Sequence, residues 1–182
     1  AEMVFVAVPS FGEARVAEVC AKKLKTDQYV YLTSGYMYGS VEFKKTLLSL
    51  GHSAVVRVAE MNNTIYAGGR LDAVSVRAGG YKHGVGVASF PGSDTRVMVR
   101  CLQKLYPEVV AFGNVIETGI SNPNVALHPA VVLFNAGYVG CGEDVLLYHD
   151  QKYLAAMSRP VADIYESMDE ERLCLRACPS FE

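Results

Sequence analysis

The sequence lacks several features that assign a protein of 182 residues to a class at once. No uninterrupted apolar run reaches the roughly 20 residues that a membrane-spanning helix needs. Lysine and arginine form no cluster, and the formal net charge is −2, so the basic surface typical of nucleic-acid-binding proteins is missing. We therefore expect a protein that contacts neither a membrane nor nucleic acid.

The five cysteines lack the Cys-x-x-Cys spacing of zinc sites and redox pairs. Their odd number also argues against a framework of disulfide bonds. The first residues are apolar, but they have neither the basic region nor the cleavage site of a signal peptide. These features predict a cytoplasmic protein with reduced thiols and no bound metal.

Up to about residue 113, the sequence alternates between apolar strands and amphipathic helices. The apolar runs 4–8, 29–33 and 54–59 are typical of strands buried in a parallel sheet. Helices with one apolar face follow the first two runs, and such an order predicts right-handed crossovers. A parallel sheet is therefore expected, and residues 1–113 resemble the latter part of a Rossmann-like nucleotide-binding domain.

Two local patterns in this half give more specific expectations. Ser10 is predicted to cap the first helix, with Glu13 completing a capping box. Residues 74–77 and 85–90 alternate between apolar and polar side chains and are separated by glycines, which favours an antiparallel hairpin between these two strands.

Beyond residue 113 the periodicity changes, and the sequence predicts helices only. We expect residues 114–182 to form the start of a helical domain. The predicted fold class is therefore α/β followed by all-α: the latter part of a Rossmann-like parallel sheet domain, then part of a helical domain.

The stretch from Asn122 to Gly137 is the most informative part of the chain, because it places a histidine directly before a proline. The residue before a proline avoids the α region, and proline favours the first helical position, so Pro129 is expected to open a helix behind His128. The positive end of the helix dipole then disfavours the imidazolium, and a neutral histidine can act as a general base. The alternative is a capping or core histidine with a structural role.

This stretch, with Asn124, the His128-Pro129 pair and Asn135, resembles the signature that opens the helical domain of the opine dehydrogenase family, such as octopine and nopaline dehydrogenases. The resemblance implies that His128 is the catalytic acid/base and that Asn124 contributes to substrate binding. It also implies NAD or NADP as the cofactor. The reaction would be the reductive condensation of an amino acid with a 2-keto acid, and its reverse.

The same family resemblance extends to the first half of the chain. The strand that ends in Val-Pro-Ser is similar to the one that approaches the nicotinamide, and ligands of open parallel sheets bind at strand carboxyl ends. Pro9, Ser10, Ser34 and Gly35 are therefore the expected cofactor contacts, although turns after strands use these residue types routinely. Asn62 lies in a segment that resembles the family's substrate-cleft segment.

The sequence contains no Gly-x-Gly-x-x-Gly turn, so the resemblance implies that a glycine-rich strand-turn-helix unit precedes residue 1. The aspartate that pairs with the family's histidine is likewise expected beyond residue 182. If residues before the first strand normally cover its edge, that edge should drive self-association into a homo-oligomer.

Two other readings remain. A ketopantoate reductase-like or glycerol phosphate dehydrogenase-like protein would share the architecture, but these families use a lysine in the helical domain. No lysine lies between Lys104 and Lys152, which counts against them. The other alternative is a non-catalytic module that lacks the cofactor loop.

Overall fold

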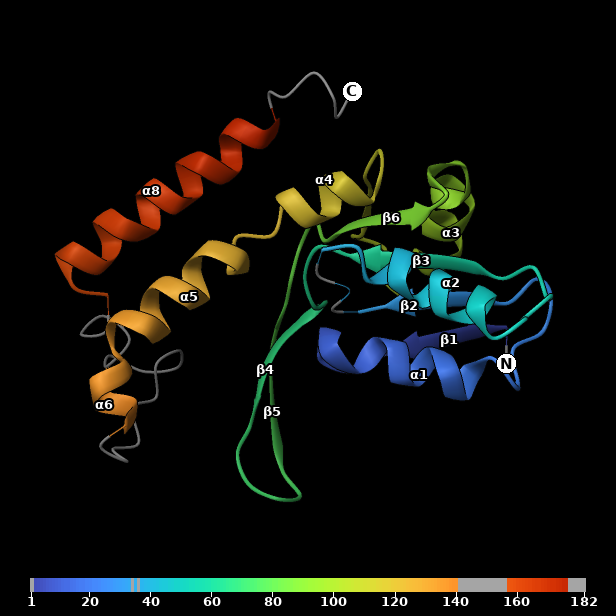
Figure 1. Cartoon of the computed structure of the whole chain (residues 1–182), viewed down its shortest axis with the longest axis horizontal. Coiled ribbons are helices and arrows are strands. Elements are labelled where there is room, and N and C mark those ends of the chain that lie inside the picture. Colours follow the sequence, from blue (N-terminus) through green and yellow to red (C-terminus); the bar gives the residue numbers. More distant parts are fainter. Residues whose placement is uncertain (1, 34, 36, 141–156, 177–182) are drawn as a thin grey trace. The chain divides into compact units, whose positions relative to one another are not determined.

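The computed structural model describes residues 2–33, 35, 37–140 and 157–176 (Figure 1). The chain divides into two compact units, residues 1–121 and residues 122–182. The domain boundary expected near residue 113 stays a prediction. Within the described part, no helix is long and apolar enough to cross a membrane.

The first unit is built on a five-stranded mixed sheet with the strand order β1-β2-β3-β6-β7. β1, β2 and β3 run parallel, β6 runs antiparallel to β3, and β7 runs parallel to β6. The expected α/β class with a mostly parallel sheet is thus confirmed. The strands are β1 Met3–Val6, β2 Tyr29–Leu32, β3 Arg57–Met61, β6 Gly86–Phe90 and β7 Val110–Ala111.

Helices cover both faces of this sheet, because successive side chains of a buried strand point to opposite sides. α1 (Glu13–Cys20) and α2 (Gly39–Ser49) pack against the face that carries Leu32 and Val58. α3 (Thr95–Leu102) packs against the face that carries Tyr31 and Met61. Short 3₁₀ turns at Ser10–Gly12 and Gly92–Asp94 lead into α1 and α3, and α4 spans Val115–Ile120.

The expected pairing of residues 74–77 with 85–90 is wrong. Residues Val76–Tyr81 form β5, which pairs with β4 (Tyr66–Arg70), whereas β6 lies in the main sheet. Glycine suits this pairing: a Cβ on Gly68 would lie 2.9 Å from the Arg77 carbonyl oxygen, closer than a side chain tolerates at that position.

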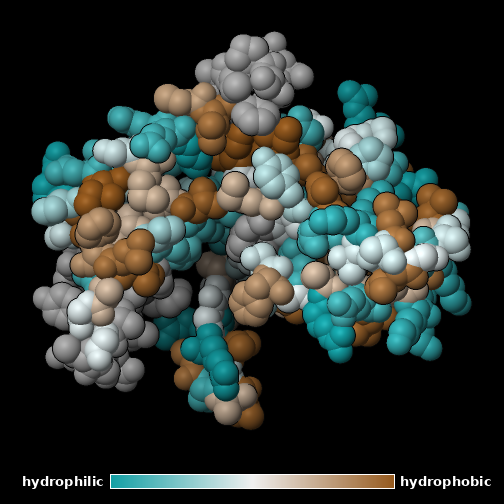
Figure 2. Space-filling view, in the orientation of Figure 1, coloured by the Kyte–Doolittle hydropathy of each residue, from teal (hydrophilic) through white to brown (hydrophobic). Residues whose placement is uncertain are grey.

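The β4–β5 hairpin extends away from the sheet of the first unit (Figure 1). Its far end carries the exposed apolar side chains of Leu71, Val74 and Val76. Hydrophobic and hydrophilic residues lie side by side at this end in the space-filling view (Figure 2). A two-stranded hairpin is only marginally stable by itself, so its conformation depends on the sheet at its base.

The capping box expected at Ser10 and Glu13 does not form. Ser10 begins a 3₁₀ turn, and no side chain caps the start of α1 at Gly12. The side chain of Glu13 is only 2% exposed and is directed at Gly39, at the start of α2. A tertiary contact therefore replaces the local one.

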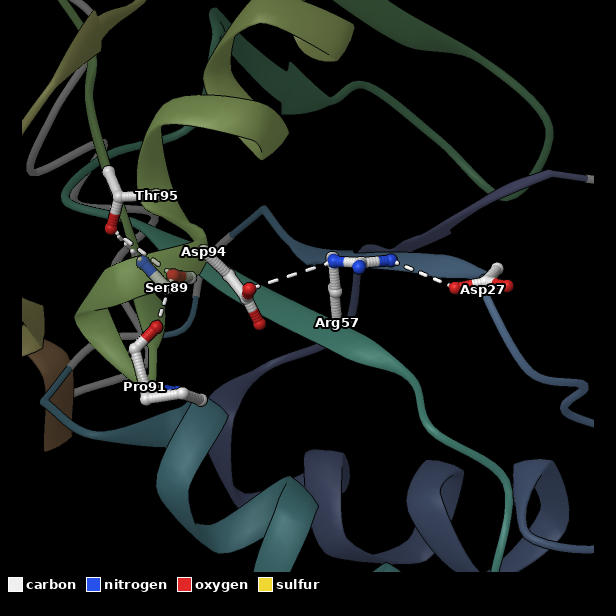
Figure 3. A network of polar contacts seen from close by, with 6 residues as sticks. All are labelled: Asp27, Arg57, Ser89, Pro91, Asp94 and Thr95. Carbon is white, nitrogen blue, oxygen red and sulfur yellow. Dashed lines mark hydrogen bonds and ion pairs between the residues drawn. The ribbon is translucent and has the colours of Figure 1, made fainter.

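Arg57 connects three segments at the start of β3 (Figure 3). Its guanidinium lies 3.1 Å from a carboxylate oxygen of Asp27, before β2, and 3.6 Å from one of Asp94, before α3. The guanidinium also lies over the ring of Tyr29, 5.7 Å from its centroid. Arg57 is partly exposed, so solvent screens both pairs and each adds little to stability.

The second unit is helical in its described residues, with α5 (Asn124–Phe134), α6 (Ala136–Gly140) and α8 (Arg159–Arg176). α5 packs against α8 through the buried side chains of Ala130, Val131 and Val161. Pro160 lies in the first turn of α8, where a missing N–H leaves no hydrogen bond unmade. The predicted helical second part is confirmed.

Neighbouring leucines on α2 provide a test of this arrangement. Leu47 is 2% exposed and Leu48 is 73% exposed. Leu47→Ala should lower the free energy of unfolding by about 2–5 kcal/mol, because it leaves a cavity between α2 and the sheet. Leu48→Ala should change it by less than about 0.5 kcal/mol. Urea unfolding of both variants measures the difference, and equal effects would contradict the packing of α2.

Candidate active site

The carboxyl ends of β1, β2 and β3 lie along one edge of the sheet, where open parallel sheets bind ligands. Pro9 and Ser10 follow β1 at this edge, and both are exposed. The backbone N–H and the hydroxyl of Thr33 donate to the Val6 carbonyl, at 2.9 and 3.1 Å, so the segment after β2 is tied to the end of β1. Ser34 lies outside the described residues.

Gly35 is buried in the turn between β2 and α2. A Cβ at this position would lie 2.7 Å from Cβ of Glu60 and 2.9 Å from Cβ of Leu32. Only glycine lets the turn approach β3 and β2 so closely. The glycine predicted as a cofactor contact therefore also has a packing role, which determines how the turn lies at the sheet edge.

The next residues of the turn have strained backbones. Met37 and Tyr38 have φ angles of 59° and 75°, in the left-handed region that costs an L-residue roughly 1–2 kcal/mol. Such strain persists only where the surrounding structure compensates for it. In this turn the compensation comes from Glu60, on the neighbouring strand β3.

Glu60 is fully buried, and its carboxylate accepts four hydrogen bonds. One oxygen accepts from the N–H and the hydroxyl of Ser40, at 2.9 and 2.6 Å. The other accepts from the Tyr38 N–H at 3.3 Å and from the Thr118 hydroxyl at 2.9 Å. Because Ser40 lies at the start of α2, the carboxylate also lies at the positive end of that helix.

Burial raises the pKa of Glu60, and the hydrogen bonds from Ser40, Thr118 and Tyr38 oppose this rise. The side chain lies on the same face of β3 as Val58, so the sequence placed a carboxylate where the apolar alternation predicts a core residue. That interruption was the available signal for a buried structural carboxylate. The buried role of Glu60 was not predicted from the sequence, because the family resemblance pointed to Asn62 in the same segment.

Asn62 follows β3 at the same edge. Its backbone N–H donates to the Gly86 carbonyl and its side-chain oxygen accepts from the Gly86 N–H, both at 2.9 Å. The ammonium of the neighbouring Lys82 donates to Asn63 Oδ1 at 2.7 Å and to Thr64 Oγ1 at 3.1 Å. Burial lowers the pKa of this lysine. The edge thus holds an amide and a cation, and the sequence analysis had not considered Lys82.

The structure contradicts the expected position of His128 at a helix N-terminus. α5 begins at Asn124, with Pro123 as its cap residue, so His128 and Pro129 both lie inside the helix. The Asn122 side chain accepts from the Asn124 N–H at 3.0 Å and supports this earlier start. Pro123 therefore has the role that was predicted for Pro129.

His128 is exposed on α5, and desolvation by the residues around it lowers its pKa. The helix dipole, invoked from the sequence, is not the cause. The direction of the shift is nevertheless the one that favours a neutral imidazole, which can accept a proton. Further along the helix, Nδ2 of Asn135 donates to the Val131 carbonyl at 2.8 Å.

Within the described part of the chain, no group of three or more His, Cys, Asp or Glu side chains could hold a metal ion. The residues of the candidate site offer polar groups and an imidazole that can transfer a proton. One part is an open sheet edge with a rigid turn, of the kind that binds nucleotides in α/β proteins. The other is a titratable imidazole on a helix of the second unit.

The described chain thus combines a mostly parallel α/β unit with a helical unit. No profile of a known protein family matches the chain. The curated opine dehydrogenase of Arthrobacter sp. (strain 1C) is 25% identical to it over 175 residues, which are 96% of this chain and 47% of that protein. The chain thus spans about half the length of this curated relative.

Solved structures agree with this similarity. Octopine dehydrogenase with NADH and L-arginine matches with a TM-score of 0.63 at 16% identity, over 98% of this chain and 45% of that chain. Yersinopine dehydrogenase with NADP⁺ matches with a TM-score of 0.57, also at 16% identity, over 72% of this chain and 32% of that chain. The predicted resemblance to opine dehydrogenases is confirmed.

Glu60→Gln tests how strongly the carboxylate holds the turn. An amide nitrogen at this site would face hydrogen-bond donors, leaving one of them unsatisfied, so the free energy of unfolding should fall by about 1–3 kcal/mol. Glu42→Gln, at an exposed position on α2, should have little effect. Urea unfolding at pH 7 measures both, and an unchanged stability of the Glu60 variant would contradict the four-donor arrangement.

Proposed function

We propose that this chain provides the substrate-side half of the nucleotide-binding domain and part of the catalytic helical domain of an opine dehydrogenase-like oxidoreductase. The reaction is the NAD(P)H-dependent reductive condensation of an amino acid with a 2-keto acid, and its reverse. The observation that carries the proposal is His128, an imidazole of lowered pKa within the segment that resembles the family's catalytic signature.

The residues of the chain have separate roles in this proposal. Pro9, Ser10, Ser34 and Gly35, at the carboxyl ends of β1 and β2, contact the nicotinamide side of the cofactor, and Asn62 faces the substrate. The sequence contains no glycine-rich pyrophosphate turn, so this chain holds only part of the cofactor. The cofactor supplies or accepts a hydride.

His128 moves the proton in this scheme. In the reductive direction the imidazolium donates a proton at the centre that forms the secondary amine, and in the reverse direction the neutral imidazole accepts it. Asn124 lies one helical turn before His128 on α5 and contributes to substrate binding on that face. A cytoplasmic location is expected from the same resemblance.

Relatives indicate which ligands to assay first. The solved octopine dehydrogenases carry NADH with pyruvate, agmatine or L-arginine, and yersinopine dehydrogenase carries NADP⁺. The proposal is therefore tested by measuring the oxidation of NADH or NADPH in the presence of pyruvate and a panel of amino acids. The assay uses the full-length protein that contains this chain. Failure of every pair, with the protein folded and cofactor bound, would overturn it.

His128→Ala in that protein should lower turnover by about 10²–10⁴-fold, the range that general acid–base groups contribute. Cofactor affinity should stay within about twofold, because the residue lies outside the nucleotide-binding sheet. His83→Ala, which removes an exposed imidazole from the first unit, is the control and should leave turnover unchanged. If activity of the His128 variant only tracks its folded fraction, the histidine is structural.

The pH profile adds an independent readout. The reverse, oxidative reaction needs neutral His128, so its rate should rise with pH through an apparent pKa below the ordinary value of 6.5 and then level off. The His128→Ala variant should lack this rise. A wild-type profile without an inflection below pH 6.5 would contradict the role of the imidazole as base.

The 182-residue chain alone should bind NADH and NADPH only weakly, because its sequence lacks the glycine turn that holds the pyrophosphate. Titration calorimetry measures this directly. Micromolar binding of either dinucleotide would mean that residues of this chain provide a different phosphate site.

A further inference from the structure

Glu13 is the second carboxyl group buried beneath the start of α2. It is 2% exposed, and its Oε1 is buried without a hydrogen-bond partner among the described residues. Its Oε2 lies against Cα of Gly39, so that a methyl group on Gly39 would overlap it. A buried, ionised carboxylate without a partner is strongly unfavourable, and the group neutralises instead.

The donors around the two carboxyl groups suffice for one of them. Ser40 contributes its N–H and hydroxyl, Tyr38 its N–H, and Thr118 its hydroxyl, and all four are directed at Glu60. Glu60 is therefore the group suited to carry the charge. Glu13 receives none of these hydrogen bonds.

We propose that Glu13 is a positioning residue that is held protonated beneath the start of α2, and that its ionisation loosens the β2–α2 turn through repulsion from Glu60. Ionisation of Glu13 then adds a negative charge next to Glu60. This idea rests on the proposed function in one respect only, which is that the turn carries Gly35, a candidate cofactor contact.

Glu60 is the charged group that repels Glu13 when Glu13 ionises. Among the described residues, Glu60 of β3 is the titratable side chain whose charge affects the pKa of Glu13. The side chains that α2 and α4 direct at Glu60 are the uncharged hydroxyls of Ser40 and Thr118. Arg15, on the same helix, pairs with Glu18. Among the described residues around the pair, no cation therefore stabilises the ionised form of both carboxyl groups.

Burial, followed by the charge of Glu60, raises the pKa of Glu13 to about 7 from its ordinary value of 4.5. Because the pKa in the folded state is the higher one, the folded state binds the extra proton between these values. The stability from Glu13 is thus fully present below pH 4.5 and is lost as the pH rises through 7. Glutamine, which resembles the protonated acid, should retain this stability at every pH.

Unfolding by urea from pH 5 to pH 8 tests this, on the wild type, Glu13→Gln and the exposed control Glu18→Gln. Relative to Glu13→Gln, the folding equilibrium constant of the wild type should fall by up to tenfold per pH unit below pH 7 and then level off. Glu18→Gln should parallel the wild type. Parallel curves for the wild type and Glu13→Gln would overturn the proposal.

Hydrogen exchange tests the effect on the turn. The amides of Tyr38 and Ser40 donate to Glu60, and their protection factors should fall between pH 5 and pH 8 in the wild type but stay constant in Glu13→Gln. An equal fall in both proteins would show that the turn does not respond to Glu13. Neither experiment uses cofactor or substrate, so both are independent of the dehydrogenase assays.

A substitution pair tests the geometry without reference to pH. Gly39→Ala should destabilise the protein, because its methyl group overlaps Oε2 of Glu13. Glu13→Ala in the same chain should relieve most of this loss. If Gly39→Ala destabilises the wild type and the Glu13→Ala protein equally, Gly39 and Glu13 are not in contact, which would contradict the proposal.

Discussion

The carboxylate of Glu60 is the interaction on which the sheet edge depends. It brings three elements of the first unit together, because Ser40 belongs to α2, Thr118 to α4 and Glu60 itself to β3. Its hydrogen bond from Tyr38 also supports a left-handed turn that would be unfavourable alone. A buried charge is tolerated here because four donors and a helix start surround it.

Desolvation acts on the buried carboxyl pair and on His128 in the same way but shifts their pKa values in opposite directions. Glu13 and Glu60 lie in the core of the first unit, where desolvation raises the pKa of both carboxyl groups. His128 lies exposed on α5, and desolvation by the residues around it lowers its pKa. Desolvation disfavours the charged form in each case, which is why acids and bases shift in opposite directions.

Much of the fold could be predicted from local patterns. The apolar runs located β1, β2 and β3, and the change of periodicity near residue 113 predicted the helices that follow. Predictions failed where a distant contact competed with a local signal. Ser10 and Glu13 form no capping box, because Glu13 is buried against the start of α2. The strand at Val76–Tyr81 pairs with the glycine-containing strand β4 and not with β6. For His128, an earlier proline opened the helix.

By itself, the sequence determined the alternation of strands and helices, the change to a helical second part, and the resemblance carried by the His128 segment, because these depend on neighbouring residues. Only the tertiary structure decided which strands pair, since β6 joins β3 across 24 intervening residues. It also decided that Glu13 and Glu60 share one buried site. Residues 47 positions apart meet there because the parallel sheet brings α1 and β3 together, and no local pattern encodes such a distance.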